Sequence, residues 1–369
     1  MTPRERMFCA IDQLPVDRLP VCTYNCHPFA GSMHVKDAGY APILAAIRQT
    51  QAGCLCKVRY RRLGSSSLTV RSWMDKSDTY HETTWQTPLG PLTRLDRTPD
   101  GQPSLCVKAF VSDDGDIEKF FSTKIEVADC DVTPAVMMAR EIGENGLAYI
   151  PYGDPFYRVA ELFDPEDLAI QTATDMDRLH QMVDFAFLQV QRDLTCLLDA
   201  LKLFDEPFLF FTVGPELATP PMMSPTVFRD LVVPYQKQLV DMIHACNYRV
   251  SLHCHGRVRE VFPYVLQCGF DAIEPLEPPP QGNIGLDELY TEAEDQIALM
   301  GYVQDQDFYL LAEEDIRNWV RTICDQMVGK KGYLCCPTCT PFQFPPSAQY
   351  VKNYVAFLEA AEEFGGCDM

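Results

Sequence analysis

The 369-residue sequence has no long hydrophobic run and few basic residues. No segment approaches the ~18 uninterrupted apolar residues of a membrane-spanning helix, and residues 1–21 contain no apolar stretch of signal-peptide length. Lys and Arg number 31 against 52 Asp and Glu, so the formal net charge is −21. A chain this acidic repels phosphate backbones and anionic lipid surfaces. We therefore expect a cytoplasmic protein that binds neither nucleic acid nor a membrane.

The sequence also lacks the common motifs of several enzyme classes. It has no GxGxxG after an apolar run, no GxxxxGK[ST], no HExxH and no GxSxG. Dinucleotide-binding loops, P-loops, zincin proteases and serine hydrolases therefore receive no support. Cysteine, in contrast, is abundant, with 16 residues. In a long chain without a secretion signal, we interpret these cysteines as reduced thiols in a reducing, even anaerobic, cytosol, and some as candidate metal ligands.

The apolar pattern predicts alternating strands and helices. Hydrophobic residues form 47% of the chain, which is enough for a large core. From residue 146 onward the apolar runs are GLAYIP, PFLFFTV, YRVSLH, DAIEPL, IALMGY and GYLCC. Helical periodicity occurs between or after them, at 176–204, 225–246, 257–268, 312–328 and 347–364. This alternation is typical of β/α units around a parallel sheet.

The amino-terminal third has a different pattern. The run LPVCTY and a helical stretch at 41–50 precede residues 57–111, which are polar and interrupted by Gly and Pro. Within them, SLTVRSWM and TYHETTWQ predict antiparallel hairpins. Because this segment is too polar to form its own core, we interpret it as an extension covering one end of a barrel. We predict one α/β domain over 1–369, a (β/α)8 TIM barrel in which 1–145 include a helical and β-hairpin extension.

The segment SLHCHG at 251–256 carries the clearest chemical signal. On a strand that runs through His255, His253 and His255 point to one side and Cys254 to the other. Gly256 permits a sharp turn after the strand, so both imidazoles lie at its carboxyl end, where barrel enzymes keep their active sites. Two convergent imidazoles are a common way to bind a transition metal. The alternative is two histidines satisfied by hydrogen bonds in a loop.

Two later segments offer further ligands at the same end of the barrel. In GYLCCPTCTP, Cys335 and Cys336 lie on a strand and are expected to pack in the core. Cys339 lies in the loop beyond, where a thiolate can reach a metal, although a buried inert thiol is the alternative. In DAIEPLEPPP, Glu274 and Glu277 end the strand that follows the histidine pair. Carboxylates among prolines need a metal or a cation when buried, and we favour Glu277 over Glu274; a solvated loop is the alternative.

Residues after other strands are candidates for contact with a substrate. Glu216 follows the strand before the histidine strand, and we assign it a catalytic role, as a substrate-orienting group or general acid/base. A solvated carboxylate at a helix start is the alternative. Met222 lies in a loop that can line an apolar pocket, and Tyr152 and Asp154 follow GLAYIP at the same face. With Glu274, these three residues form the predicted substrate-binding set.

Taken together, these features resemble the uroporphyrinogen decarboxylase superfamily, and in particular its corrinoid-dependent methyltransferase branch, which is cobalamin/coenzyme M methyltransferase-like. The resemblance covers nearly the whole chain and implies a single (β/α)8 barrel with an N-terminal extension. It rests on four segments: MTPRERMFCAIDQLPVDRLPV, GPELATPPMMSPTVFRDLVVPYQKQLVDMIHACNYRVSLHCHG, GFDAIEPLEPPPQGNIGLDEL and GYLCCPTCTPFQFPPSAQYVKNYVAFLEAA.

The resemblance also implies a zinc site. In the methyltransferase branch, a His-x-Cys-Gly motif and a later cysteine hold zinc, and the metal activates a thiol that takes a methyl group from methylcobalamin. By position, His253 matches the histidine, His255 stands where the first cysteine would be, and Cys339 matches the later cysteine. Glu277 or Glu274 occupies the place of an acidic residue that joins the metal in some members. Replacing a thiolate by a neutral imidazole makes the zinc a stronger Lewis acid, which leaves the acceptor thiol, coenzyme M, open.

These observations predict a zinc-dependent methyltransferase of anaerobic one-carbon metabolism. It would move a methyl group between a small methylated substrate or thiol acceptor and a corrinoid. The corrinoid is methylcobalamin as co-substrate or the cofactor of a partner corrinoid protein, and the direction of transfer is open. The predicted Zn(II) ligands are His253, His255 and Cys339, with Glu277 as an exchangeable fourth ligand. A homodimer is compatible with the sequence.

Three other functions stay open. Members of the decarboxylase branch resemble one another in an RQAGRY-type segment, whose arginines neutralise the carboxylates of a tetrapyrrole. The corresponding TYNCHPFAGSM has no arginine, so a uroporphyrinogen decarboxylase-like tetrapyrrole-acting enzyme is less favoured. A non-catalytic corrinoid binder would use the histidine pair as a cobalt or iron ligand. A metal hydrolase would need a strand-end base, for which Asp271 and Asp305 are the candidates.

Overall fold

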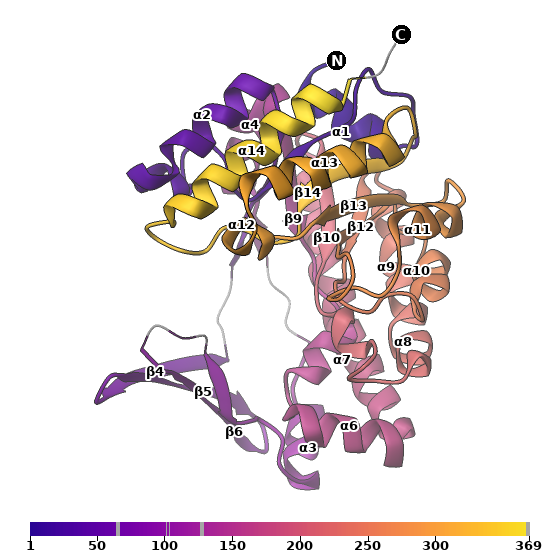
Figure 1. Ribbon diagram of the computed structural model, residues 1–369. Coiled ribbons are helices and arrows are strands. Elements are labelled where there is room, and N and C mark those ends of the chain that lie inside the picture. The colour runs from indigo at the N-terminus through magenta and orange to yellow at the C-terminus, as the bar shows by residue number, and fades with distance from the viewer. Residues whose placement is uncertain (64–66, 101, 103, 126–128, 367–369) are drawn as a thin grey trace.

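A ring of eight parallel strands forms the centre of the molecule (Figure 1). The first and last strands close the ring, because Val21 bridges Cys335 in parallel and the Cys335 amide donates to the Pro20 carbonyl at 2.8 Å. The (β/α)8 barrel predicted from the sequence is therefore confirmed.

The computed structural model describes residues 1–63, 67–100, 102, 104–125 and 129–366. In ring order the strands are β1 (Cys22–Tyr24), β2 (Gly53–Lys57), β9 (Gly146–Pro151), β10 (Phe208–Thr212), β11 (Arg249–His253), β12 (Ala272–Leu276), β13 (Ala298–Val303) and β14 (Tyr333–Pro337).

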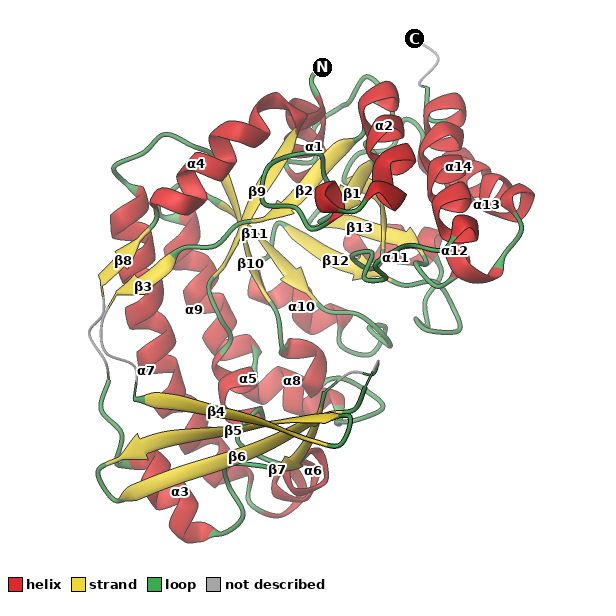
Figure 2. Cartoon of the chain, turned by 90° about the vertical axis from the view of Figure 1, so that its left-hand side faces the viewer, coloured by secondary structure: helices red, strands yellow, loops and turns green. Residues whose placement is uncertain are grey.

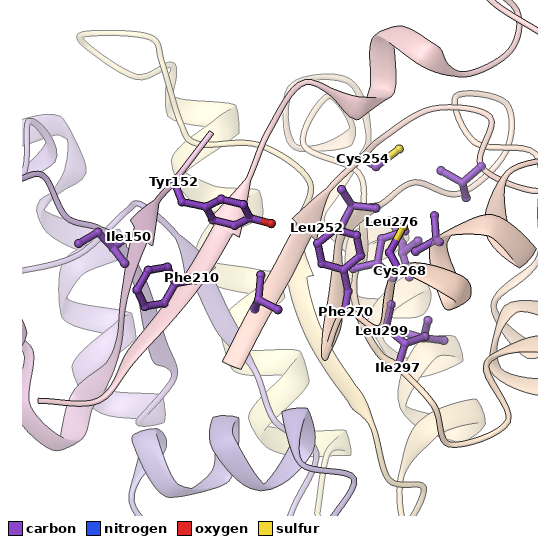
Figure 3. Packing of buried hydrophobic residues seen from close by; sticks show 14 of the residues in the cluster. Ile150, Tyr152, Phe210, Leu252, Cys254, Cys268, Phe270, Leu276, Ile297 and Leu299 are labelled. Atoms are coloured by element: carbon purple, nitrogen blue, oxygen red, sulfur yellow. The ribbon is translucent and has the colours of Figure 1, made fainter. Parts of the chain in front are cut away.

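Strands β10, β12 and β14 are buried along their whole length because both of their faces are covered. One face belongs to a compact inner cluster that includes Leu55, Tyr149 and Phe211. The alternate residues belong to the large outer cluster between strands and helices. Figure 3 shows part of this outer cluster, in which Tyr152 lies beside Phe210.

Helices surround the strands (Figure 2) and connect most of them in sequence. The outer cluster draws its apolar residues from these helices as well as from the strands. The helices of the described residues, short 3-10 turns apart, are α1 (Pro3–Ile11), α2 (Ala41–Thr50), α3 (Asp114–Phe121), α4 (Thr133–Ile142), α5 (Pro155–Ala160), α6 (Pro165–Thr174), α7 (Met176–Leu201), α8 (Pro225–Leu231), α9 (Val233–His244), α10 (Phe262–Cys268), α11 (Leu286–Ala293), α12 (Asp307–Leu310), α13 (Glu313–Met327) and α14 (Ala348–Phe364).

Two predicted helices are shorter than the apolar period indicated, and proline explains both differences. The stretch 225–246 divides at Val232 into α8 and α9, because Pro234 is accommodated only in the first turn of a helix. The stretch 257–268 becomes helical only at Phe262, and Pro263 again lies in the first turn. A side-chain period cannot detect these breaks, because the apolar positions continue across them.

The predicted hairpins form a four-stranded antiparallel sheet, which is inserted in the chain between β2 and β9. Its strands are β4 (Leu68–Asp75), β5 (Asp78–Thr87), β6 (Gly90–Thr98) and β7 (Leu105–Lys108). Trp85 of β5 packs against Phe110 and Phe120, and the sheet lies beside α3 in both views (Figures 1 and 2). A two-stranded ribbon of β3 (Arg61–Leu63) and β8 (Asp129–Asp131) connects this insertion to the barrel. That 1–369 form one domain stays a prediction.

Within the described part of the chain, no helix is both long and apolar enough to cross a membrane. The longest, α7, carries buried apolar residues on one face and charged residues on the other. It is therefore an amphipathic helix that packs one face on the barrel.

Gly301 gives a test of the barrel geometry. Its φ of +129° is disfavoured for residues with a side chain, and an added Cβ would lie 2.5 Å from the Leu276 nitrogen, where β12 and β13 shift register. We expect Gly301→Ala to cost at least about 2 kcal/mol in the free energy of unfolding. The control, Gly285→Ala, places its Cβ in open space and should cost less than about 1 kcal/mol. Thermal unfolding measures both, and equal midpoints would contradict the assigned backbone.

Candidate metal centre

The histidine pair lies at the carboxyl end of β11. His253 is the last residue of the strand, Cys254 is fully buried, and Gly256 adopts a φ of +85° that reverses the chain. The strand ends two residues earlier than expected, although the Cys254 amide still donates to the Glu274 carbonyl at 2.7 Å. The imidazole rings of His253 and His255 are close, with centroids 5.4 Å apart. The two side chains therefore converge while Cys254 points away into the outer cluster.

Glu216 completes a group of three potential metal ligands. One ligand atom from each of Glu216, His253 and His255 lies within 4.8 Å of the other two. Among the described residues this is the only set of three His, Cys, Asp or Glu side chains that meets this condition. Glu216 follows β10, and its Oε2 accepts a hydrogen bond from the Gly214 amide at 2.7 Å. Two imidazoles and one carboxylate are a common donor set for a divalent transition metal.

Two further carboxylates lie behind the two imidazoles. Both oxygens of Glu274 are 3.1 Å from Nδ1 of His253, and Oε2 of Glu277 is 3.6 Å from Nδ1 of His255. Glu277 also accepts the Gly256 amide at 2.7 Å. Because Nδ1 of each ring faces a carboxylate, Nε2 is the nitrogen left to bind a metal. Such carboxylates fix the tautomer and orientation of metal-binding histidines.

The partnership of Glu274 and His253 is almost completely buried. Glu274 is 1% exposed, and the Tyr24 hydroxyl lies 3.2 Å from Nδ1 of the same histidine. Burial favours the neutral imidazole, but the nearby Glu274 carboxylate outweighs it and raises the pKa of His253 above its usual value. At Glu277, burial acts to raise the pKa, but hydrogen bonds with His255 and other donors lower it overall. Each of the two carboxylates thus lies against one imidazole of the pair.

Cys339 lies outside the group of three. Its Sγ donates to the Thr340 carbonyl at 3.4 Å, and burial, followed by the charges of Asp305 and Glu277, raises the pKa of its thiol to about 11. Cys335 and Cys336 are fully buried on β14, as expected. Of the four predicted metal ligands, the structure therefore brings His253 and His255 together, places Glu277 behind His255 and leaves Cys339 at one side.

Tyr152 and Asp154 are held in a buried network of their own. The Tyr152 hydroxyl donates to Oε1 of Gln236 at 2.7 Å, and Nε2 of the same amide donates to Asp154 at 2.5 Å. Asp154 also accepts the Tyr157 amide at 2.6 Å and so caps α5. These contacts give both residues a structural role, and their part in substrate binding stays a prediction. Met222 is 47% exposed in the loop after Glu216.

Two residues near the histidines were not among the predicted site residues. Tyr24 ends β1 and contacts His253, and Lys57 ends β2 with its Nζ 5.0 Å from the centroid of the Phe211 ring. Burial and then the charge of Arg59 lower the pKa of Lys57. The alternation in GCLCK, which places Lys57 on the same side as the inward-facing Leu55, is a signal that identifies it. Tyr24 carries no comparable signal, because its contact depends on closure of the barrel.

The two candidate bases for a hydrolase are engaged elsewhere. Asp271 lies before β12, at the opposite end of the barrel strands from the histidines, and accepts from the Val250 amide at 2.7 Å and contacts Nε2 of His244 at 2.8 Å. Asp305 is buried, and the Tyr350 hydroxyl donates to it at 2.7 Å. Neither belongs to the group of three potential ligands found among the described residues.

Comparison with known proteins agrees with this fold and places the chain in a family. The family model described as uroporphyrinogen decarboxylase (URO-D) matches residues 170–364, more than half of the sequence, and the chain therefore belongs to that family. A solved structure described as a methyltransferase from Methanosarcina mazei is similar, with a TM-score of 0.60 and 15% sequence identity over 99% of both chains. At this identity the similarity concerns the fold. No curated protein sequence matches the chain.

The buried Asp154 predicts a pH effect on stability. Burial raises the pKa of its carboxyl to about 7, from 3.8 in the absence of such an environment. Between these values the folded state holds a proton that the unfolded state has lost, so the free energy of unfolding falls as pH rises from about 4 to 7. Because the Asn amide stays neutral, we expect the free energy of unfolding of Asp154→Asn to decrease less than that of the wild type over this pH range. Denaturant unfolding at pH 5 and pH 8 compares the two proteins, and an unchanged pH dependence in the variant would contradict the assignment.

Proposed function

We propose that the protein is a zinc-dependent methyltransferase that transfers a methyl group between a small substrate and a corrinoid. The observation that carries the proposal is the group formed by Glu216, His253 and His255 at the carboxyl end of the barrel strands. Membership of the URO-D family and the fold shared with a methyltransferase from Methanosarcina mazei support it. The sequence resemblance to the zinc-containing methyltransferase branch also supports it, because that branch is expected to hold metal ligands at this position.

The donor set fits zinc. Imidazole nitrogen and carboxylate oxygen both bind Zn(II), and three protein ligands leave a position for a reacting atom. We therefore assign Glu216, His253 and His255 as ligands, while Cys339 stays a candidate for a further one. A bound zinc ion supplies Lewis acidity, which lowers the pKa of a thiol acceptor or polarises a methoxy or amine leaving group.

The surrounding residues prepare the site. Glu274 and Glu277 keep each imidazole oriented with Nε2 toward the shared centre, so little reorganisation accompanies binding. Tyr24 and Glu274 are buried, which keeps water from the inner side of His253. His255 is half exposed, with 49% of its side chain accessible, and so lies toward the open side from which a substrate enters.

The corrinoid is proposed to approach from the same side, as methylcobalamin or as the cofactor of a separate corrinoid protein. A corrinoid bound there would accept or donate the methyl group, so the group of Glu216, His253 and His255 would need to be accessible from this side. The exposed Met222 lies in the loop that follows Glu216 and is assigned to this approach. The direction of transfer is left to experiment.

Two alternatives have weaker support. A decarboxylase acting on a tetrapyrrole needs cations for many carboxylates, and residues 23–33 contain no arginine. In the structure, Asn25 of this segment instead donates a hydrogen bond to the Tyr149 hydroxyl of β9 at 2.7 Å. A non-catalytic corrinoid binder would show visible absorbance from cobalt, which zinc does not give.

Metal content gives the first test. We expect anaerobically purified protein to hold about one zinc per chain, and His253→Ala, His255→Ala and Glu216→Gln each to lose most of it because each removes one of three ligands. Cys339→Ala serves as the discriminating variant, since retained zinc would exclude its thiol as an essential ligand. Elemental analysis makes the measurement, and zinc that is unchanged in all the histidine and Glu216 variants would contradict the site.

Catalysis is tested with the same samples. We expect zinc-loaded protein to demethylate methylcobalamin with a thiol acceptor, or to methylate reduced cobalamin from a methylated donor, and both histidine variants to lose at least ~100-fold in rate. The change in the corrin spectrum reports either direction. Zinc-loaded protein that is inactive in both directions across thiols, methoxy compounds and methylamines would contradict methyl transfer and leave the metal site standing.

Glu274 and Glu277 allow a matched comparison of the carboxylates behind the ligands. Glu274→Gln should weaken zinc affinity by about 10–100-fold, because the amide no longer fixes the His253 tautomer and leaves a buried imidazole without its charged partner. Glu277→Gln should have a smaller effect, since His255 is half exposed and 3.6 Å away. Competition with a chromophoric chelator measures both affinities. Equal losses, or a larger loss for Glu277→Gln, would contradict the assigned roles.

A further inference from the structure

Two cysteines from separate parts of the chain touch at the surface, away from the metal centre. Cys130 lies on β8 and Cys196 on α7, and their Sγ atoms are 3.4 Å apart. The Cys130 thiol also donates to the Cys196 carbonyl at 3.3 Å. We propose that Cys130 and Cys196 are a thiol modification site that forms a reversible disulfide by exchange with a low-molecular-weight disulfide such as oxidised glutathione.

The position of the pair allows a small oxidant to reach it. Both residues are partly exposed, and they line a surface groove of about 370 Å³ together with Asp129, Arg192 and Asp199. Cys22 and Cys336 also interact, but both are fully buried within the barrel. Access therefore distinguishes the surface pair from the thiols of the core, and oxidation is expected to be selective.

The order of the two thiols in the exchange follows from their surroundings. Burial first, and then contact with Cys196 and the charges of Asp129 and Asp131, raise the pKa of Cys130 to about 12. A thiol so reluctant to ionise is a poor first nucleophile. The geometry agrees, because the Cys130 S–H donates to the Cys196 carbonyl at 3.3 Å and so holds its proton. We therefore assign Cys196 as the attacking residue and Cys130 as the resolving residue, which reacts only when a disulfide sulfur is already beside it.

The exchange balances as follows. The Cys196 thiolate attacks one sulfur of oxidised glutathione, the glutathione S–S bond breaks, and the released glutathione thiolate takes up the proton from Cys196. Cys130 then attacks the Cys196 sulfur of the mixed disulfide, and the second glutathione leaves with the Cys130 proton. Two protein thiols are oxidised to one disulfide, and one glutathione disulfide is reduced to two thiols.

The disulfide would attach the β3–β8 ribbon, which connects the inserted sheet to the barrel, covalently to α7. β8 pairs with β3, and Arg62 of β3 forms an ion pair with Asp193 of α7 at 3.2 Å. Asp193 also binds Arg158 of α5 at 3.0 Å. The ribbon of β3 and β8 is thus already held on α7 by charge, and a disulfide one turn further along α7 makes that attachment covalent. It also closes a long loop, from Cys130 to Cys196, which restricts the unfolded chain.

The experiment uses the full-length protein, purified anaerobically and incubated with oxidised glutathione. After free thiols are blocked, non-reducing peptide mapping should show one linked peptide containing Cys130 and Cys196, and thiol titration should show two thiols fewer per chain. The thermal midpoint should rise by about 3–6 °C and return when a reductant is added. Zinc content of the same samples is measured to separate this result from the proposed function.

Variants make the assignment specific. Cys130→Ser should stop at the mixed disulfide with glutathione on Cys196, whereas Cys196→Ser should lose both the link and the mixed disulfide. Cys246→Ser, at another partly exposed cysteine, should leave both intact. A wild-type protein that retains glutathione on Cys196 without resolution, or whose oxidised thiols lie elsewhere, would overturn the proposal, whatever the zinc content.

Discussion

Closure of the barrel between β1 and β14 is the constraint on which the site depends. Because the strands are parallel, closing the sheet brings all of their carboxyl ends to one rim. Tyr24 and His253 end their strands, Glu216 follows β10 and Glu274 lies within β12, yet the side chains of these four residues meet near that rim. Without the pairing of β1 to its neighbours, Tyr24 would not reach His253. The fold therefore supplies the proximity, and the residues supply the chemistry.

Burial of Glu274 then fixes the direction of the histidine. An ionised carboxylate at 1% exposure is costly unless it is paired, and here both of its oxygens face Nδ1 of His253. Removing either partner leaves the other buried without its counterpart, which is more destabilising than the pair is stabilising. The imidazole orientation therefore contributes to stability as well as to the proposed metal site. The side chains of the proposed metal site are therefore held in place by contacts within the protein itself.

The sequence predicted the barrel because its strands are apolar runs buried on both faces, and strands from GLAYIP to GYLCC follow that rule. It also indicated His253, His255 and Glu216, since each stands at the end of a strand. It favoured Glu277 as a metal ligand and gave Glu274 to the substrate, whereas the structure places each carboxylate against Nδ1 of one imidazole. Which imidazole each carboxylate faces depends on the pairing of β11 with β12, which a single segment does not contain. Tyr24 and the Cys130–Cys196 contact depend on packing between distant segments, which no local pattern contains.

Under the proposed function, the charges around the histidines account for an imidazole, His255, at the position where the resemblance to the methyltransferase branch implies a thiolate. A zinc ion held by two thiolates and a neutral histidine would have no net charge, whereas one held by Glu216, His253 and His255 would keep one positive charge. Glu274 and Glu277 each lie behind one imidazole, so that a single imidazole ring separates each carboxylate from the proposed metal position. Part of the negative charge that offsets the metal ion would therefore come from these two carboxylates and not from the ligand atoms. A zinc ion in the proposed site would therefore be a stronger Lewis acid toward its open position, with the carboxylates of Glu274 and Glu277 behind its ligands.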